Sequence, residues 1–375
     1  MDTSMFRRKI RNLNRLFLQI RSQYSVLLLL VAVGGAVLIA ARYSRLNYLI
    51  AAATATGGIL ALHELHYARR IAESEFIRDL NTAFTGDEAI TELWRRLLLD
   101  EPITSIHRLN ISSYFTFFET LFLLMERGVL RFGMVDDLFR NRFFTAIGNP
   151  EIQKIALISN HEAFRNVHAL TRSWSNYLRK NCYAPHPGYL RYLLASMEAA
   201  GFQIAPIGPE ALGNLLDLQN RVIAEIEDSK LLRINDEQAL LSCLREQYCL
   251  GAIRPTGELV AVVIMYIAGD NEEPLLSHIS KDLMRQKTSA NVKLILVDPK
   301  YQRSGLGKSL LEALEIHAIQ QGKGDLACTV HPRNRASKHL FASLGFERRK
   351  RVVTEYGSRY IYTRRLPKRG KSSPS

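Results

Sequence analysis

A short turn with two glycines lies between an apolar stretch and an amphipathic stretch late in the chain. The apolar stretch is Val292–Val297, and the turn from residue 302 to residue 307 reads Gln-Arg-Ser-Gly-Leu-Gly. We expect a strand before the turn and a helix after it. Glycine lets a backbone approach a ligand closely, and the unpaired N–H groups at a helix start point toward an anion. These residue types in this order predict a phosphate-binding turn.

Two familiar nucleotide-binding turns do not match this sequence. The run Gly305–Ser309 ends like a P-loop, but that motif needs a glycine where this chain has Gln302. No acidic strand partner for magnesium is evident either. A dinucleotide-binding turn needs a third glycine, and Leu310 stands in its place. The sequence therefore argues against both classes of nucleotide site.

The turn resembles the Gln/Arg-x-x-Gly-x-Gly/Ala signature of the GNAT acetyltransferase superfamily. Three neighbouring segments also resemble that family and follow in its order: Val297–Pro299 as a strand end, His331–Ala336 as a second cofactor segment, and Leu340–Phe346 as the closing helix and strand entry. The resemblance covers about half of the chain, Gly201–Leu366. It implies a mixed, splayed sheet flanked by helices, and transfer of an acyl group from acetyl-CoA to an amine.

The resemblance also implies how the cofactor is held. Backbone amides from Arg303 to Lys308 would bind the pyrophosphate, helped by the helix dipole. Lys308 would either add a positive charge to a phosphate or be a solvated lysine on the helix surface. Asn334 would contact the pantetheine arm, cap the helix that begins at Arg335, or do both. The expected cofactor-binding residues are Leu296, Val297, Gln302, Arg303, Ser304, Gly305, Leu306, Gly307, Lys308 and Asn334.

Two strands would part to admit the thioester. The resemblance implies that the strand Leu294–Val297 pairs through its backbone with the pantetheine arm and separates from the strand Leu326–Val330. A backbone N–H near Val297 would then donate to the thioester carbonyl oxygen as negative charge develops on it.

The catalytic acid and base stay unassigned. The amine must be neutral to attack, so a base or a chain of waters must take its proton. Many family members have a glutamate early in the strand before the turn and a tyrosine in the closing helix, whereas this chain has Asn291 and Phe341. His331 is a candidate base, and the alternative is a strand-end polar residue without a catalytic role. Tyr356 is a candidate acid, although a CoA thiolate is a good leaving group without one.

The four cysteines give no sign of a metal site. They are Cys182, Cys243, Cys249 and Cys328, and none belongs to a Cys-x-x-Cys pair or lies near histidines at ligand spacing. We expect reduced, mostly structural thiols in a cytoplasmic domain, and no metal.

Two apolar stretches near the N-terminus predict a two-helix membrane anchor over residues 24–65. Ser25–Ala41 carries no charge, and Tyr48–Leu62 follows after six residues. The alternatives are a secretory signal peptide for the first stretch and a buried soluble helix for the second. Residues 1–23 form a basic segment, so the positive-inside rule predicts an inner-membrane protein whose catalytic domain faces the cytoplasm.

The region that follows, residues 66–182, repeats apolar residues at helical spacing and predicts an all-helical domain. It resembles an uncharacterised helical module that follows membrane anchors in some bacterial proteins, through the stretch Phe117–Arg140. Alternating strands and helices then occupy 201–366, and residues 367–375 form a disordered basic tail. The predicted fold class is a mixed domain with α+β and α/β character, preceded by an all-α domain and two transmembrane helices.

The net charge of +14 and the pI near 9.7 favour an anionic partner, which could be a phosphorylated cofactor, a membrane surface or nucleic acid. The basic tail lacks interleaved aromatic residues, so we do not expect nucleic acid. We expect a membrane-anchored N-acyltransferase that uses acetyl-CoA as co-substrate, with the lipid bilayer and an unidentified amine, a small molecule or a protein, as partners. Because of Asn291 and Phe341, a non-catalytic acyl-CoA sensor is the alternative.

Overall fold

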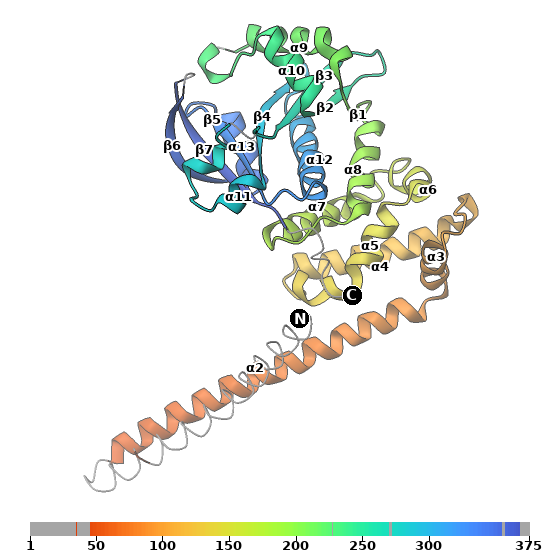
Figure 1. Ribbon diagram of the computed structural model, residues 1–375. Helices are drawn as coiled ribbons and strands as arrows, with labels where there is room; N and C mark the ends of the chain where they lie inside the picture. The colour runs from red at the N-terminus through yellow and green to blue at the C-terminus, as the bar shows by residue number, and fades with distance from the viewer. Residues whose placement is uncertain (1–34, 36–45, 227, 270–271, 355–356, 368–375) are drawn as a thin grey trace, which may run out of the picture. The chain divides into compact units, whose positions relative to one another are not determined.

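The computed structural model describes residues 35, 46–226, 228–269, 272–354 and 357–367 of the chain. The chain divides into two units, residues 1–80 and 81–375 (Figure 1). The predicted basic N-terminal segment, residues 1–23, lies outside the described residues, as does the candidate acid Tyr356. The predicted basic tail lies outside them beyond residue 367.

Helix α2 (Leu46–Gly86) accounts for most of what the structure describes of the first unit. None of the described helices is both long and apolar enough to cross a membrane, so the predicted pair of transmembrane helices is wrong. The apolar run Tyr48–Leu62 is short for a span of about 20 residues, and His63 and Glu64 follow it directly in the same helix. The other predicted span, Ser25–Ala41, lies outside the described residues except for Gly35. The predicted inner-membrane location stays a prediction.

The second unit begins with helices. They are α3 (Glu88–Leu98), α4 (Arg108–Glu126), α5 (Phe132–Ile147), the short α6 (Pro150–Ile152), α7 (Arg165–Lys180) and α8 (Pro187–Ala199). A 3-10 turn at Ser105–His107 and a π-helical turn at Gln153–Leu157 connect them. No strand occurs between residues 66 and 182, all of which the structure describes. We call residues 81–199 the helical region.

An aromatic core holds the helical region together. Phe118, Phe143 and Trp174 are fully buried, and the Trp174 ring stacks on Phe143 with their centroids 5.3 Å apart. The Trp174 indole N–H donates to Asp136 Oδ1 over 2.6 Å, so the one polar atom of this ring is satisfied inside the core. Side-chain caps fix the helix starts, as where Asp87 accepts a hydrogen bond from the Ile90 N–H.

A seven-stranded sheet follows, with strand order β1-β2-β3-β4-β5-β7-β6. The strands are β1 (Gln203–Pro206), β2 (Tyr248–Ile253), β3 (Leu259–Tyr266), β4 (Ser289–Val297), β5 (Asp325–Val330), β6 (Glu347–Thr354) and β7 (Gly357–Arg365). Every neighbouring pair is antiparallel except β4 and β5, which run parallel. The expected mixed sheet is therefore present.

Helices cover both faces of this sheet (Figure 1). They are α9 (Leu212–Ala224) and α10 (Glu237–Glu246) on one face, and α12 (Leu306–Gln320) and α13 (Arg335–Ser343) on the other, with the short α11 (Leu283–Lys287) before β4. Strand β3 shows why helices are needed on both faces of the sheet. Val262 packs with the α9 side and Val263 with the α12 side, because successive side chains of a strand point to opposite faces.

The parallel pair β4–β5 is joined only at its beginning. Ser289, Ala290 and Asn291 pair with Asp325, Leu326 and Ala327, and the pairing stops there. The strands therefore part after Asn291 on β4 and after Ala327 on β5. The predicted splay is present, and on β5 it starts two residues later than Leu326.

The pH dependence of stability tests the packing of the helical region. His168 is 4% exposed, and burial, followed by repulsion from His161, lowers its pKa to about 4. A folded-state pKa below the unfolded value of about 6.5 adds stability above pH 6.5, and that stability is lost as the pH falls toward 4. Between pH 7 and pH 4 we expect the free energy of unfolding to fall by about 1–3 kcal/mol less in His168→Gln than in the wild type. Thermal melts measure this, with exposed His339→Gln as the control. Equal pH dependence in wild type and His168→Gln would contradict the assignment.

Candidate functional site

The backbone of the predicted phosphate turn takes conformations that favour glycine. Strand β4 ends at Val297, a 3-10 turn covers Pro299–Tyr301, and α12 begins at Leu306. Gly305 precedes the helix with φ +88°, a left-handed value that strains other residue types. Arg303 also has a positive φ, +64°. The chain thus reverses direction sharply between the strand and the helix.

Several N–H groups of this turn have no protein acceptor. Ser309 makes the first backbone bond of α12, to Gly305 over 3.0 Å. Among the described residues, no acceptor lies within hydrogen-bond geometry of the five backbone N–H groups of Arg303, Gly305, Leu306, Gly307 and Lys308. Arg303 and Gly305 are exposed, Gly307 and Lys308 are half-buried, and Leu306 is buried, so the exposed end of this row of donors is accessible to a ligand. Unpaired N–H groups at a helix start form an anion site.

Gly307 brings the first turn of α12 close to β4. A Cβ at this position would lie 3.3 Å from the Val297 side chain and 3.6 Å from that of Leu340. Gln302 and Ser304 point into the turn itself, since Gln302 Nε2 donates to the Val297 carbonyl (3.4 Å) and Ser304 Oγ to the Tyr301 carbonyl (2.6 Å). Lys308 is half-buried and forms no ion pair with a described residue.

Asp298 holds the turn against the sheet. Its carboxylate is 1% exposed and accepts from Arg221 Nε (2.6 Å) and from the Lys300 N–H (3.0 Å). Its own N–H donates to the Val260 carbonyl on β3 over 2.8 Å. Arg221 comes from α9 and also donates to the Leu259 carbonyl. A buried, paired carboxylate at this point therefore fixes where β4 ends and the turn begins.

The free edge of β4 presents alternate backbone groups. Because Asp298 donates to β3 and alternate N–H groups of a strand point to the same edge, the N–H of Leu296 also faces β3. The N–H groups of Val297 and Ile295 point to the other edge, where β5 has already separated. Leu296 turns its side chain into the core on the α9 side and is 2% exposed. Of the two strand residues expected at the cofactor, only Val297 offers its N–H to the gap.

A cavity of about 480 Å³ opens where the two strands part. Asn291 lies at its start, and the Asn291 Oδ1 atom is buried without a hydrogen-bond partner among the described residues. Phe341 lines the cavity and is 3% exposed. The lining includes Arg233, Tyr266, His278, Asn291, Lys293, Leu294, Ile295, Cys328, Thr329, Val330, His331, Asn334, Phe341 and Arg359.

The candidate base His331 lies in this cavity wall. Its Nδ1 accepts from the Arg333 N–H over 3.2 Å. Burial, and then the positive charges of Arg359 and Arg333, lower the pKa of His331 below its usual value. The ring is therefore neutral at pH 7, which is the form that accepts a proton.

Asn334 and Tyr266 complete the polar wall. Asn334 caps α13 by accepting from the Ser337 N–H (2.9 Å), and its Nδ2 donates to the Leu231 carbonyl (3.4 Å), so the expected capping role is present. The sequence pattern does not mark Tyr266, which reaches the cavity from the end of β3. Its hydroxyl donates to Glu272, and burial, followed by this bond, raises the pKa of Tyr266 to about 12.

Residues 212–346 match the model of the acetyltransferase (GNAT) family. This part of the chain is a GNAT acetyltransferase domain. It is an N-acetyltransferase domain, and acetyl-CoA is the co-substrate of this family. The domain explains the parted strands and the open turn, and the predictions of family and co-substrate are confirmed for the C-terminal half. No curated protein gives a significant sequence match.

Solved acetyltransferases align with less than half of this chain. The ribosomal-protein-S18-alanine N-acetyltransferase from Escherichia coli is 22% identical, with 46% of this chain and 99% of that chain covered and a TM-score of 0.35. The paia N-acetyltransferase from Thermoplasma acidophilum, in complex with coenzyme A, is 17% identical (44% and 99% covered, TM-score 0.34). The yncA protein from Salmonella typhimurium, with its cofactor acetyl-CoA, is 19% identical (47% and 98% covered, TM-score 0.35).

The residues present fit this co-substrate. Five unpaired N–H groups suit a diphosphate, Gly307 keeps the turn close to β4, and the unpaired edge at Val297 and Ile295 suits an extended amide-bearing arm.

Replacing Gly305 tests the turn. A carboxylate in Gly305→Glu would occupy the open N–H groups and repel a diphosphate, so we expect the Kd for acetyl-CoA to rise by about tenfold or more. Gly305→Asn is the matched control, because asparagine tolerates a positive φ and no described atom lies within 4 Å of the added Cβ. Its Kd should stay within about threefold of the wild type. Isothermal titration calorimetry measures both, and normal binding by Gly305→Glu would refute the site.

Proposed function

We propose that this chain transfers the acetyl group of acetyl-CoA to an amine that binds in the cavity between β4 and β5. The observation that carries the proposal is the unpaired edge of β4, where the N–H groups of Val297 and Ile295 point away from β3, directly beside the open turn. Ile295 also lines the cavity. In this proposal, the end of β4 and the turn after it present N–H donors for a diphosphate and for the oxygen of a reacting carbonyl.

Each group of the chain has a defined task in this proposal. Acetyl-CoA supplies an activated acetyl thioester. The N–H groups of residues 303 and 305–308 would hold its diphosphate, and the Val297 or Ile295 N–H would donate to the carbonyl oxygen. Asn291 stands where many family members have a glutamate and cannot take a proton, so the amine proton would pass to His331 or to solvent.

A non-catalytic acyl-CoA sensor is the second candidate. Two observations favour it: Phe341 is a buried ring at the position where many members have a tyrosine, and Asn291 replaces the usual carboxylate. A sensor needs the open turn and the parted strands but no proton acceptor.

Turnover separates the two functions. We expect the full chain to release free CoA thiol from acetyl-CoA when amines are supplied, because an amine bound in the cavity would lie beside the free edge of β4. A thiol-reactive dye follows the release over a panel of small amines, amino acids and peptides. Calorimetry on the same preparation measures acetyl-CoA binding. Binding without turnover across the panel would establish the sensor instead.

The pH dependence of turnover tests the role of Asn291. Without a carboxylate base, kcat/KM for the amine should rise with pH as more of the amine becomes neutral. Asn291→Glu supplies a base inside the cavity, so its rate near pH 7 should exceed the wild-type rate by about tenfold or more. Asn291→Gln matches the size without the base and should not show this gain. An unchanged profile in Asn291→Glu would exclude position 291 from contact with the amine.

A further inference from the structure

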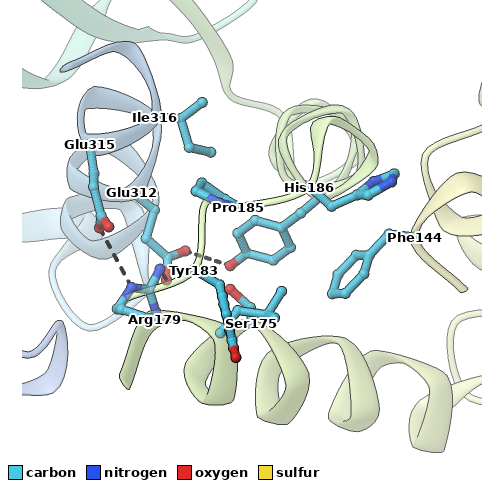
Figure 2. Close-up of a pocket in the computed structure, with 11 residues that line it drawn as sticks. Phe144, Ser175, Arg179, Tyr183, Pro185, His186, Glu312, Glu315 and Ile316 are labelled. Carbon is cyan, nitrogen blue, oxygen red and sulfur yellow. Dashed lines mark hydrogen bonds and ion pairs between the residues drawn. The ribbon is translucent and has the colours of Figure 1, made fainter. Parts of the chain in front are cut away.

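Two carboxylates lie buried on the helix that starts at the phosphate turn. The Glu312 and Glu315 side chains are 4% and 7% exposed, and they stand one turn apart on α12. Figure 2 shows both carboxylates directed toward Arg179 of α7 in the helical region. Charged groups are seldom buried unless they are paired, because desolvation costs several kcal/mol for each ion.

Two guanidinium groups balance the two carboxylates, although the buried Arg179 Nε makes no hydrogen bond to a described residue. Arg179 NH2 lies 2.7 Å from Glu312 Oε1, and Arg179 Nε lies 3.5 Å from Glu315 Oε2. Arg364 of β7 contributes the second cation, 2.7 Å from Glu315 Oε1. The Tyr189 hydroxyl of α8 donates to Glu312 Oε2 over 2.8 Å. We call these five side chains the α12 network.

Two of the five side chains of this network come from the helical region. Arg179 and Tyr189 belong to the helical region, and Arg179 is 133 residues away from Glu312 in the sequence. Burial alone would lower the pKa of Arg179, but Glu312 and Glu315 outweigh it and the pKa is raised. Removing Arg179 would leave two buried carboxylates against the single cation of Arg364.

Helix α12 connects the α12 network to the phosphate turn. Eleven of its fifteen residues are buried, so it is fixed along most of its length. Glu312 follows Leu306 by six residues, about 9 Å along a helix that rises 1.5 Å per residue. The first turn of α12 packs against β4 through Gly307, with little space between them. A change in the axial position or tilt of α12 would therefore move the open N–H groups relative to Val297.

We propose that Arg179 is a positioning residue for acetyl-CoA binding, which makes the helical region part of the acetyltransferase site. The inference rests on the proposed function only in taking the open turn as the acetyl-CoA site. It assigns a task to a region whose sequence carries no chemistry of its own.

The test uses the full chain and the variant Arg179→Met, which keeps an apolar stem and removes the charge. We expect the Kd for acetyl-CoA, measured by calorimetry, to rise by about tenfold, and KM for acetyl-CoA to rise while KM for the amine changes little. Arg179→Lys keeps a cation and should recover part of the affinity. Arg95→Met is the matched control, because Arg95 of α3 forms an exposed ion pair with Glu92 and Glu101. Its affinity should equal that of the wild type.

A double variant separates positioning from stability. Arg179→Met with Glu312→Gln leaves Glu315 paired with Arg364 and no uncompensated charge, so its melting temperature should return toward the wild-type value. Because the Arg179–Glu312 ion pair is absent, the affinity of the double variant for acetyl-CoA should stay low. If Arg179→Met alone does not fold, the double variant still tests whether the loss of Arg179 weakens acetyl-CoA binding. Wild-type affinity in a folded Arg179→Met or in the double variant would overturn the inference. Absence of acetyl-CoA binding by the wild type would instead refute the proposed function.

Discussion

The structure depends on backbone N–H groups that the fold leaves without a partner. Folded proteins pair nearly all of their buried backbone donors, so a row of open ones beside a hydrophobic core needs a structural cause. Here the cause is the separation of β4 from β5 after three residue pairs, together with the start of helix α12 at Leu306. The same element thereby offers a diphosphate site and an edge for an extended ligand, and both fit acetyl-CoA.

Rigid neighbours keep this edge open. On its other side β4 pairs with β3 along most of its length, with Lys293 as an extra residue where the register shifts. Asp298 and Arg221 then fix the point where the strand ends. The β5 edge is satisfied by β7, which pairs with β5 from Asp325 to Val330. Since both strands are held from outside, closing the gap would break pairs elsewhere in the sheet.

The helical region bears on this site through packing rather than through catalytic groups. Its aromatic core is self-contained, yet α7 and α8 present Arg179 and Tyr189 to the buried carboxylates of α12. Buried ion pairs are poor sources of net stability but constrain geometry, because each partner is costly to leave alone. The helical region and the acetyltransferase domain are thus joined at α12, and these contacts constrain the orientation of that helix.

Features that arise from neighbouring residues could be predicted from the amino-acid sequence. The strand, turn and helix around Gly305 follow from residue types within a few positions of each other. Hydropathy alone misjudged the N-terminal part, where a short apolar run in α2 passes directly into charged positions.

Contacts between residues far apart in the chain could not be predicted in this way. No local sequence pattern marks three such features: Tyr266 at the cavity, the unpaired Asn291 Oδ1, and the Arg179–Glu312 pair. Such contacts depend on how the sheet and the helices pack against one another. Arg179 and Glu312 are 133 residues apart, so no sequence spacing predicts their contact.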